Sequence, residues 1–189
     1  MPEVSGSGTA VRGLGGTAGF GELTLTRSDD ASQRINVSAV FENGFSFGGR
    51  AYDANDLYIS TDGLISFGGA ISGVRQNLAT LGLPFIAPFH ADVDTRLDGE
   101  GPESGAIHVD VDAAADVVTI TWADVGFYRR DAGKTNLFQV QLFDRGDSGM
   151  MVALRYETIE WTTGDLQGGW DGLGGTAALA GLRLSTGGA

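Results

Sequence analysis

The sequence predicts an all-β protein, an antiparallel β-sandwich of the jelly-roll-like or barrel-like kind, with few or no helices. Three observations lead to this prediction. Apolar and polar residues alternate with a period of two over short stretches, whereas helical periodicity is nearly absent. Glycine is abundant, at 31 of 189 residues, and supplies the turns between the stretches. The pair Asp62-Gly63 separates two β-type runs, which is a strong hairpin signal.

Each expected strand follows from its own alternation. In the first, Ile35, Val37 and Phe41 would share one face, and polar residues would occupy the other. The expected strands cover residues 35–41, 57–60, 64–67, 118–122, 138–142, 150–156 and 180–184. One helical turn is expected near 75–81, and the glycine-rich stretches at 6–21, 68–73 and 164–175 are expected to be loops. Many short strands with one polar face are typical of a sandwich.

Composition limits the function classes. A chain of 189 residues fits a single domain, 1–189, with a sizeable core. The absence of cysteine excludes disulfides, thiol catalysis and cysteine-type zinc sites. Twelve basic and 24 acidic residues give a net charge of −12, which argues against nucleic acid or anionic lipid as a partner. No apolar run approaches the ~20 residues of a membrane span, so no membrane insertion is expected.

Several segments occur in an order that is specific in combination. They are Phe45-Ser-Phe47 with Tyr52, LYISTDGLISF at 57–67, PFIAPFHADVDTR at 84–96, VVTITWADVGFY at 117–128, KTNLFQVQL at 134–142, YETIEWTTGD at 156–165 and Ala180-Gly181. Together they resemble the nidogen-like extracellular (NIDO) domain of nidogens, tectorins and bacterial surface proteins. The resemblance covers roughly residues 40–184, and residues 1–39 are covered less clearly. Two positions depart from the family: Asp62 replaces a usual Asn, and His90 replaces a usual aromatic residue.

The resemblance implies a non-catalytic adhesion or assembly module of a larger secreted or cell-surface protein, here expected to be bacterial. It implies an extracellular or cell-surface location and flanking domains in the full-length protein. The partner would be an extracellular protein or a glycan, reached through protein–protein or cell–matrix contact. No cofactor is required by the family, and no catalytic residue set can be carried over.

One acidic motif could bind a cation. In His90-Ala-Asp92-Val-Asp94, alternate residues of a strand would place both aspartates on one face. Carboxylate oxygens suit Ca²⁺, so Asp92 and Asp94 are the candidate metal ligands. The alternative is a solvated acidic face without metal, in which Asp94 braces Arg96 or a loop backbone. Arg96 also breaks the EF-hand spacing.

The motif recurs as His108-Val-Asp110-Val-Asp112. If the two segments paired as a hairpin, Asp92 would lie opposite Asp110, and a cation would relieve their repulsion. The alternative is again a solvated surface, which needs no pairing between the two segments.

Trp170 lies among glycines and is the candidate partner-binding residue. The alternative is that its side chain pins the loop. A carbohydrate-binding module would expose Trp170 beside Tyr128 or Phe127. A hydrolase would need a carboxylate pair, or His90 or His108 as a general base. No GxSxG elbow is present, and a lone His on a strand is more often structural.

Overall fold

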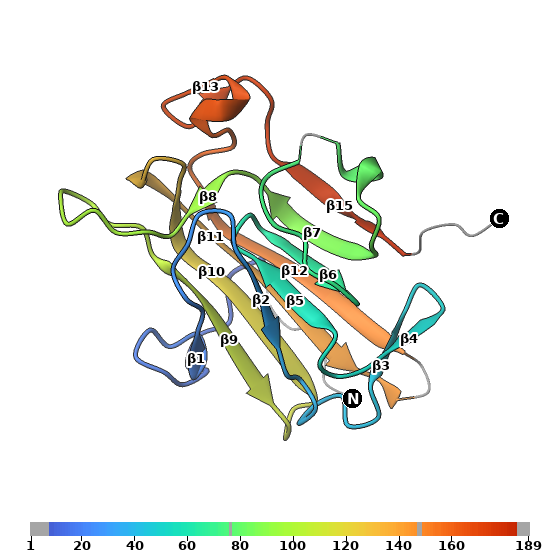
Figure 1. The fold of residues 1–189 in the computed structure, drawn as a ribbon. Coiled ribbons are helices and arrows are strands. Elements are labelled where there is room, and N and C mark those ends of the chain that lie inside the picture. The colour runs from blue at the N-terminus through green and yellow to red at the C-terminus, as the bar shows by residue number, and fades with distance from the viewer. Residues whose placement is uncertain (1–7, 76, 147–148, 185–189) are drawn as a thin grey trace.

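The computed structural model describes residues 8–75, 77–146 and 149–184. In this part of the chain two antiparallel sheets pack face to face as a sandwich (Figure 1). The first sheet, in spatial order, contains β1 (Leu23–Thr24), β9 (Ala106–Asp112), β10 (Val117–Phe127), β11 (Asp131–Asp144) and β12 (Met150–Ile159), with β8 (Val93–Asp94) also beside β10. The second contains β15 (Leu179–Arg183), β7 (Phe85–His90), β6 (Leu64–Phe67), β5 (Leu57–Ser60) and β2 (Ser32–Ile35). The predicted fold class is confirmed.

Smaller elements lie at the ends of the sandwich. Two short hairpins are formed by β3 (Phe45–Phe47) with β4 (Arg50–Tyr52), and by β13 (Gly169–Trp170) with β14 (Leu173–Gly174). The 3-10 helices η1 (Leu78–Thr80) and η3 (Asp165–Gln167) are single turns, and η1 confirms the helical turn expected near 75–81. None of the helical segments in the described part of the chain is long and apolar enough to cross a membrane.

The core lies between the sheets and is rich in aromatic rings. Trp122 of β10 stacks on Phe138 of β11 with centroids 5.0 Å apart, and Phe89 of β7 contacts Phe138 at 5.3 Å. Phe89 also meets the edge of Trp161 at 5.4 Å. Burying each such side chain contributes about 2–3 kcal/mol, so this cluster joins the sheets strongly.

The predicted hairpin between β5 and β6 is confirmed, but its turn is a three-residue loop, Thr61–Gly63. Gly63 alone takes the left-handed conformation, with φ of 68°, and a Cβ there would lie 1.9 Å from Phe89 O. The loop is fully buried, and Trp122 Nε1 donates to Thr61 O at 3.0 Å. The turn therefore sends the side chain of Asp62 into the interior instead of into solvent.

The strand predicted over residues 35–41 is wrong beyond its first residue. Strand β2 ends at Ile35, and the chain then turns, with the amides of Val40 and Phe41 both donating to Val37 O at 3.0 and 2.9 Å. All three of these side chains are buried. The turn points these apolar side chains into the core. Their spacing in the sequence therefore resembles strand alternation over a short stretch.

The structure also decides two possibilities that the acidic motifs left open. Asp110 of β9 pairs with Thr119 of β10, and Asp92 does not lie opposite it, because β8 and β9 pair with different parts of β10. The expected solvated face is absent at the first motif, since His90, Asp92 and Asp94 are at most 2% exposed. The chain passes from the second sheet to the first between β7 and β8, so this segment is covered on both faces.

Candidate functional site

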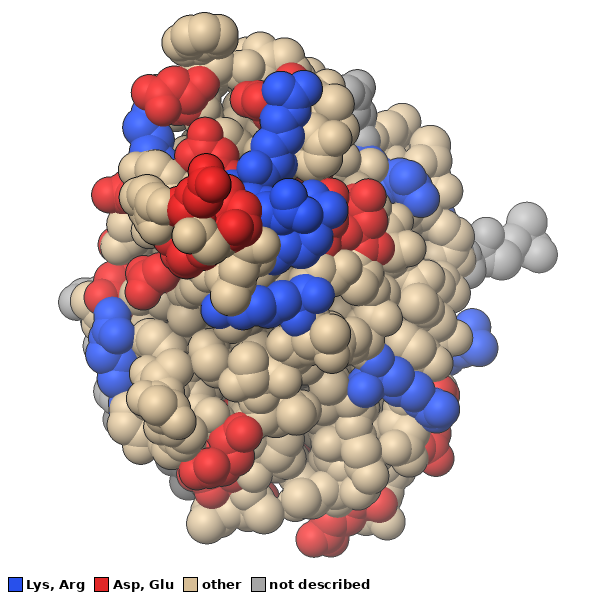
Figure 2. All heavy atoms as spheres, turned by 60° about the vertical axis from the view of Figure 1, so that its left-hand side comes forward, with Lys and Arg blue, Asp and Glu red and all other residues tan. Residues whose placement is uncertain are grey.

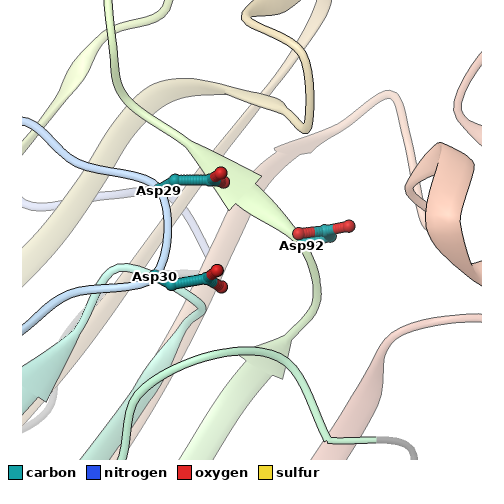
Figure 3. A group of neighbouring side chains, drawn as sticks. All are labelled: Asp29, Asp30 and Asp92. Atoms are coloured by element: carbon teal, nitrogen blue, oxygen red, sulfur yellow. The ribbon is translucent and has the colours of Figure 1, made fainter.

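The candidate site lies where the chain passes between the two sheets. The link from β1 to β2 carries Asp29 and Asp30, and the link from β7 to β8 carries Asp92; each link joins one sheet to the other. Figure 3 shows the carboxylates of Asp29 and Asp30 directed towards Asp92. One carboxylate oxygen from each of the three lies within 4.8 Å of the others. We call Asp29, Asp30, Asp62 and Asp92 the crossover cluster.

Asp62 is the most buried member of the crossover cluster. Its residue is 0% exposed, and neither carboxylate oxygen accepts a well-formed hydrogen bond among the described residues. Burial, helped by the charges of Asp30, Asp92 and Asp29, raises its pKa to about 9. The backbone N–H of Val93 has the smallest effect on its pKa, a lowering, and donates to Ala91 O at 2.8 Å. A carboxylate in this position is therefore costly unless a positive charge joins it.

The pKa values of Asp92 and Asp29 are raised as well. Burial raises the pKa of Asp92, an effect that the neighbouring Gln167 amide partly offsets, and Asp92 Oδ2 has no hydrogen-bond partner in the described structure. Burial, followed by the charge of Asp94, raises the pKa of Asp29 to about 6 although Arg96 opposes it. Asp30 is exposed, so the cluster reaches solvent on that side.

Asp94 has a different environment. Its Oδ1 accepts hydrogen bonds from the backbone N–H and the Nε of Arg96 at 3.0 and 2.9 Å. Its Oδ2 accepts from Arg96 Nη2 at 2.6 Å and from the backbone N–H of Arg130 at 3.1 Å. Of the two predicted ligands, Asp92 thus joins the crossover cluster, and Asp94 is occupied by Arg96, which also pairs with Asp29 at 2.8 Å.

The β1–β2 link is fastened to Thr95, which directly follows β8. Ser28 N–H donates to Thr95 Oγ1 at 2.8 Å, and Thr95 N–H donates to Ser28 O at 2.9 Å. Arg27 Nη1 donates to the carbonyl oxygens of Thr95, Ser104 and Gly105 at 2.7–2.8 Å. These bonds hold the carboxylates near one another despite their repulsion.

His90 bonds to the backbone around the crossover cluster and is not available as a general base. Its Nε2 accepts from the backbone N–H of Arg75 at 2.8 Å, so its Nδ1 carries the proton and donates to Asp62 O at 2.8 Å. Burial lowers the pKa of His90, which keeps the ring neutral. Both ring nitrogens are therefore used to position the loop that carries Asp62.

Trp170, the predicted partner-binding residue, projects from the hairpin of β13 and β14 and is 87% exposed. Leu166 and Leu173 nearby are 61% and 51% exposed. The hairpin is braced, since Lys134 Nζ donates to Asp171 O and Oδ2, both at 2.6 Å. The tip therefore presents an apolar surface in a fixed position.

The aromatic row expected of a carbohydrate-binding module is wrong at Phe127, which is 1% exposed and packs on Trp161 at 5.3 Å. The reason is a β-bulge: Trp122 pairs with Phe138, whereas Val125 pairs with Asn136, so β10 holds one extra residue. The bulge turns the side chains after it to the opposite face, and Phe127 points into the core.

Charged side chains gather on one face of the molecule. Figure 2 shows acidic and basic side chains side by side in the upper part of this face. The side chain of Arg96 is 37% exposed. Among the described residues, Arg96 is the one cation that forms ion pairs with the aspartates at the crossover.

Comparison with known proteins agrees with the architecture. The family described as "Nidogen-like domain" matches residues 104–187. Alpha-tectorin from Gallus gallus is 33% identical over 149 residues, and alpha-tectorin from Mus musculus is 32% identical over the same length. Each alignment covers 67% of this chain and 7% of the relative, so the chain spans a small part of these proteins. No solved structure matches.

These matches confirm that the chain carries a nidogen-like domain. Nidogen-like domains are extracellular modules, which places the chain outside the cell or at its surface. The expected bacterial source stays a prediction.

Sequence reasoning missed Asp29, Asp30 and Asp62 as parts of the site. Asp29 and Asp30 lie in the region that the family resemblance covered least clearly. Asp62 departs from the family's usual Asn and lies between two runs of buried residues, which is a signal. A turn position, however, is a sufficient reason for an Asp there. Only the fold brings residues 29, 62 and 92 together.

Proposed function

We propose that this chain is a non-catalytic adhesion or assembly module, one domain of a larger secreted or cell-surface protein, and that it contacts a partner protein through Trp170. The observation that carries the proposal is a tryptophan 87% exposed on a braced hairpin. Tryptophan is enriched among residues that dominate binding energy, and a rigid support lowers the entropy lost on binding. Leu166 and Leu173 extend the apolar contact around it.

A protein partner is favoured over a glycan. Phe127 is buried and Tyr128 is half-buried, so neither lies beside Trp170 as an exposed stacking platform. Two exposed leucines, Leu166 and Leu173, lie near Trp170. The hollow beside it is lined by the charged residues Arg129, Asp131, Asp165 and Asp171. An apolar centre with a charged rim suits a protein interface. The chain covers 7% of alpha-tectorin, and we propose that further domains flank it in its own parent protein.

A hydrolase is less well supported. A carboxylate pair must reach both substrate and water, whereas Asp62 and Asp92 are at most 2% exposed. His90 has both ring nitrogens engaged with the backbone. The geometry of these groups favours a structural role.

The test compares Trp170→Ala with a matched control, Leu97→Ala, which removes an apolar side chain that is 49% exposed on another loop. The immobilised chain is incubated with the secreted and surface proteins of its source organism, and retained proteins are quantified by mass spectrometry. Trp170→Ala should bind a retained protein with about 30-fold lower affinity than the wild type does. Leu97→Ala should bind it with unchanged affinity. Equal retention by wild type and Trp170→Ala would contradict the proposal. Glycan-array binding that depends on Trp170 would favour the carbohydrate-binding alternative.

A further inference from the structure

We propose that Asp29, Asp30, Asp62 and Asp92 form a calcium site that fastens the two sheets together at their crossover links. The site is separate from the Trp170 surface and does not depend on the function proposed for it. Its ligands come from three positions far apart in the sequence: the β1–β2 link, the β5–β6 loop and the β7–β8 link.

The spacing of the oxygens fits one shared ion. Ligand oxygens lie about 2.4 Å from Ca²⁺, so two oxygens on the same ion are at most about 4.8 Å apart. The carboxylates of Asp29, Asp30 and Asp92 meet this limit, because one oxygen from each lies within 4.8 Å of the others. Figure 3 shows the side chains of Asp29 and Asp30 directed towards Asp92, which turns one of its two oxygens to their side.

Asp62 supplies independent evidence for a ligand. Its carboxyl group is fully buried, yet both oxygens are without a hydrogen-bond partner in the described structure. Buried polar groups are nearly always partnered, and an orphaned carboxyl needs an explanation such as an ion. The charges of Asp30, Asp92 and Asp29 raise the pKa of this carboxyl, so it lies in their neighbourhood, although the 4.8 Å limit groups only those three residues. As the fourth ligand of the ion it would have to move closer to them.

The surrounding charge also calls for a cation. Arg96 pairs with Asp94 at 2.6 Å and with Asp29 at 2.8 Å. No other described Lys or Arg forms an ion pair with the crossover cluster, so Asp30, Asp62 and Asp92 are left unbalanced. Asp29 Oδ1 is a buried oxygen without a partner among the described residues, whereas Asp92 has the side-chain amide of Gln167 beside it. A divalent ion would neutralise two of these charges and satisfy several oxygens together.

The chemistry of the donors selects calcium. All four side chains offer carboxylate oxygen, and a set of oxygens is the choice of hard cations. Mg²⁺ demands octahedral geometry at about 2.0–2.1 Å and sheds water reluctantly, whereas Ca²⁺ accepts irregular coordination. The exposed side chain of Asp30 provides the route from solvent. Affinity in the range of extracellular modules, about 0.1–1 mM, would suffice outside the cell.

The position of the site explains what the ion would do. Both links run from one sheet to the other, and Ser28 of the β1–β2 link is already bonded to Thr95, which directly follows β8. A cation shared by the links and by the β5–β6 loop would add a bond between the sheets at an end where carboxylates otherwise repel. The ion is therefore a stabiliser of the sandwich and takes no part in a reaction.

The test measures thermal unfolding of the full chain after EDTA treatment, with Ca²⁺ or Mg²⁺ then added at moderate NaCl concentration. Ca²⁺ should raise the midpoint by several degrees, and Mg²⁺ should have a much smaller effect. Asp62→Asn removes the buried charge at constant shape, so it should keep or raise the midpoint without calcium and weaken calcium binding at least tenfold. Asp30→Asn, at an exposed position, should weaken binding without affecting folding.

Asp116→Asn is the matched control. Asp116 is exposed at the opposite end of β10, and its φ of 52° is tolerated by Asn. This variant should respond to Ca²⁺ as the wild type does. An unchanged wild-type midpoint, an equal response to Mg²⁺, a full response in both cluster variants, or an equal loss in Asp116→Asn would each overturn the proposal.

Discussion

Two groups of buried polar side chains in this molecule differ in whether they have hydrogen-bond partners. On β11, Asn136 Oδ1 accepts from the backbone N–H groups of Glu160 and Trp161, and its Nδ2 donates to Trp161 O. Gln139 Nε2 donates to Thr121 Oγ1 at 2.8 Å. In the crossover cluster, by contrast, Asp62 is equally buried and both of its carboxylate oxygens are orphaned among the described residues.

The difference arises from what surrounds each group. Residues on β11 face neighbouring strands, whose side chains and returning backbone offer both donors and acceptors. The crossover links supply mainly carboxylate oxygens, which are acceptors only. The polar groups of β11 therefore stabilise the fold by themselves, whereas the crossover cluster needs a positive ion. The predictions that follow test this contrast, from the largest expected effect to the smallest.

Removing Asn136 should have the largest effect. Asn136→Ala leaves one buried N–H group, one partly buried N–H group and one buried carbonyl without their partner, which should cost about 3 kcal/mol in the free energy of unfolding. Urea denaturation of both proteins measures the difference. Asn43→Ala, at an exposed position, is the control and should stay within about 0.5 kcal/mol of wild type. A cost below about 1 kcal/mol for Asn136→Ala would refute the account of β11.

Asp94→Asn should have the next largest effect on the free energy of unfolding. Asp94 is 0% exposed and accepts from Arg96 and from the Arg130 backbone, so the change breaks a buried ion pair. Arg96 is partly exposed and can regain water, which limits the expected loss to about 2 kcal/mol. The same denaturation experiment, without calcium, measures it. No loss would mean that Asp94 is not held by Arg96.

Asp62→Asn should have the opposite sign in calcium-free buffer. Because the pKa of Asp62 is raised to about 9, the folded state must hold it protonated at neutral pH, which costs stability. Asn has the same shape and avoids this cost, so stability at neutral pH should rise by about 1 kcal/mol. Two aspartates of similar burial in neighbouring positions would then respond in opposite directions. Urea denaturation in the presence of EDTA decides the point, and a loss as large as that of Asp94→Asn would contradict the contrast between them.

Glu157 should give the smallest effect, with a defined dependence on pH. Hydrogen bonds from Arg12 Nη2 and from the backbone N–H of Ala10 lower the pKa of Glu157. A lowered pKa means that the folded state favours the carboxylate, so the contribution is present at neutral pH and is lost as the pH falls through the folded pKa. Glu157→Gln should cost about 0.3 kcal/mol at pH 7 and nothing in strong acid. A cost independent of pH would exclude the ionic contribution.

The sequence predicted the repetitive parts of this structure better than the connections. Alternation at 118–122 and 138–142 identified β10 and β11, because side chains of a half-buried strand must alternate. The bulge after Trp122 had no clear signal, so the sequence did not show that Phe127 points into the core. A pattern read along the chain also carries no information on which links meet in space.

The candidate site shows the same limit. The motif at 90–94 singled out Asp92, and the geometry places that residue among other carboxylates. Asp29 and Asp30 lie more than 60 positions earlier and follow no periodic pattern. Asp62 occupies a turn position where a polar residue needs no further explanation. The carboxylates meet only because two chain crossings fall at the same end of the sandwich.

The most direct test of the central claim is a crystal structure grown with Ca²⁺ at about 1 mM, with the anomalous signal of calcium measured. We expect one anomalous peak bound by carboxylate oxygens of Asp29, Asp30, Asp62 and Asp92, and no such peak in crystals of Asp62→Asn. A wild-type map in which these carboxyl groups are bonded only to water or to protein would contradict the calcium site.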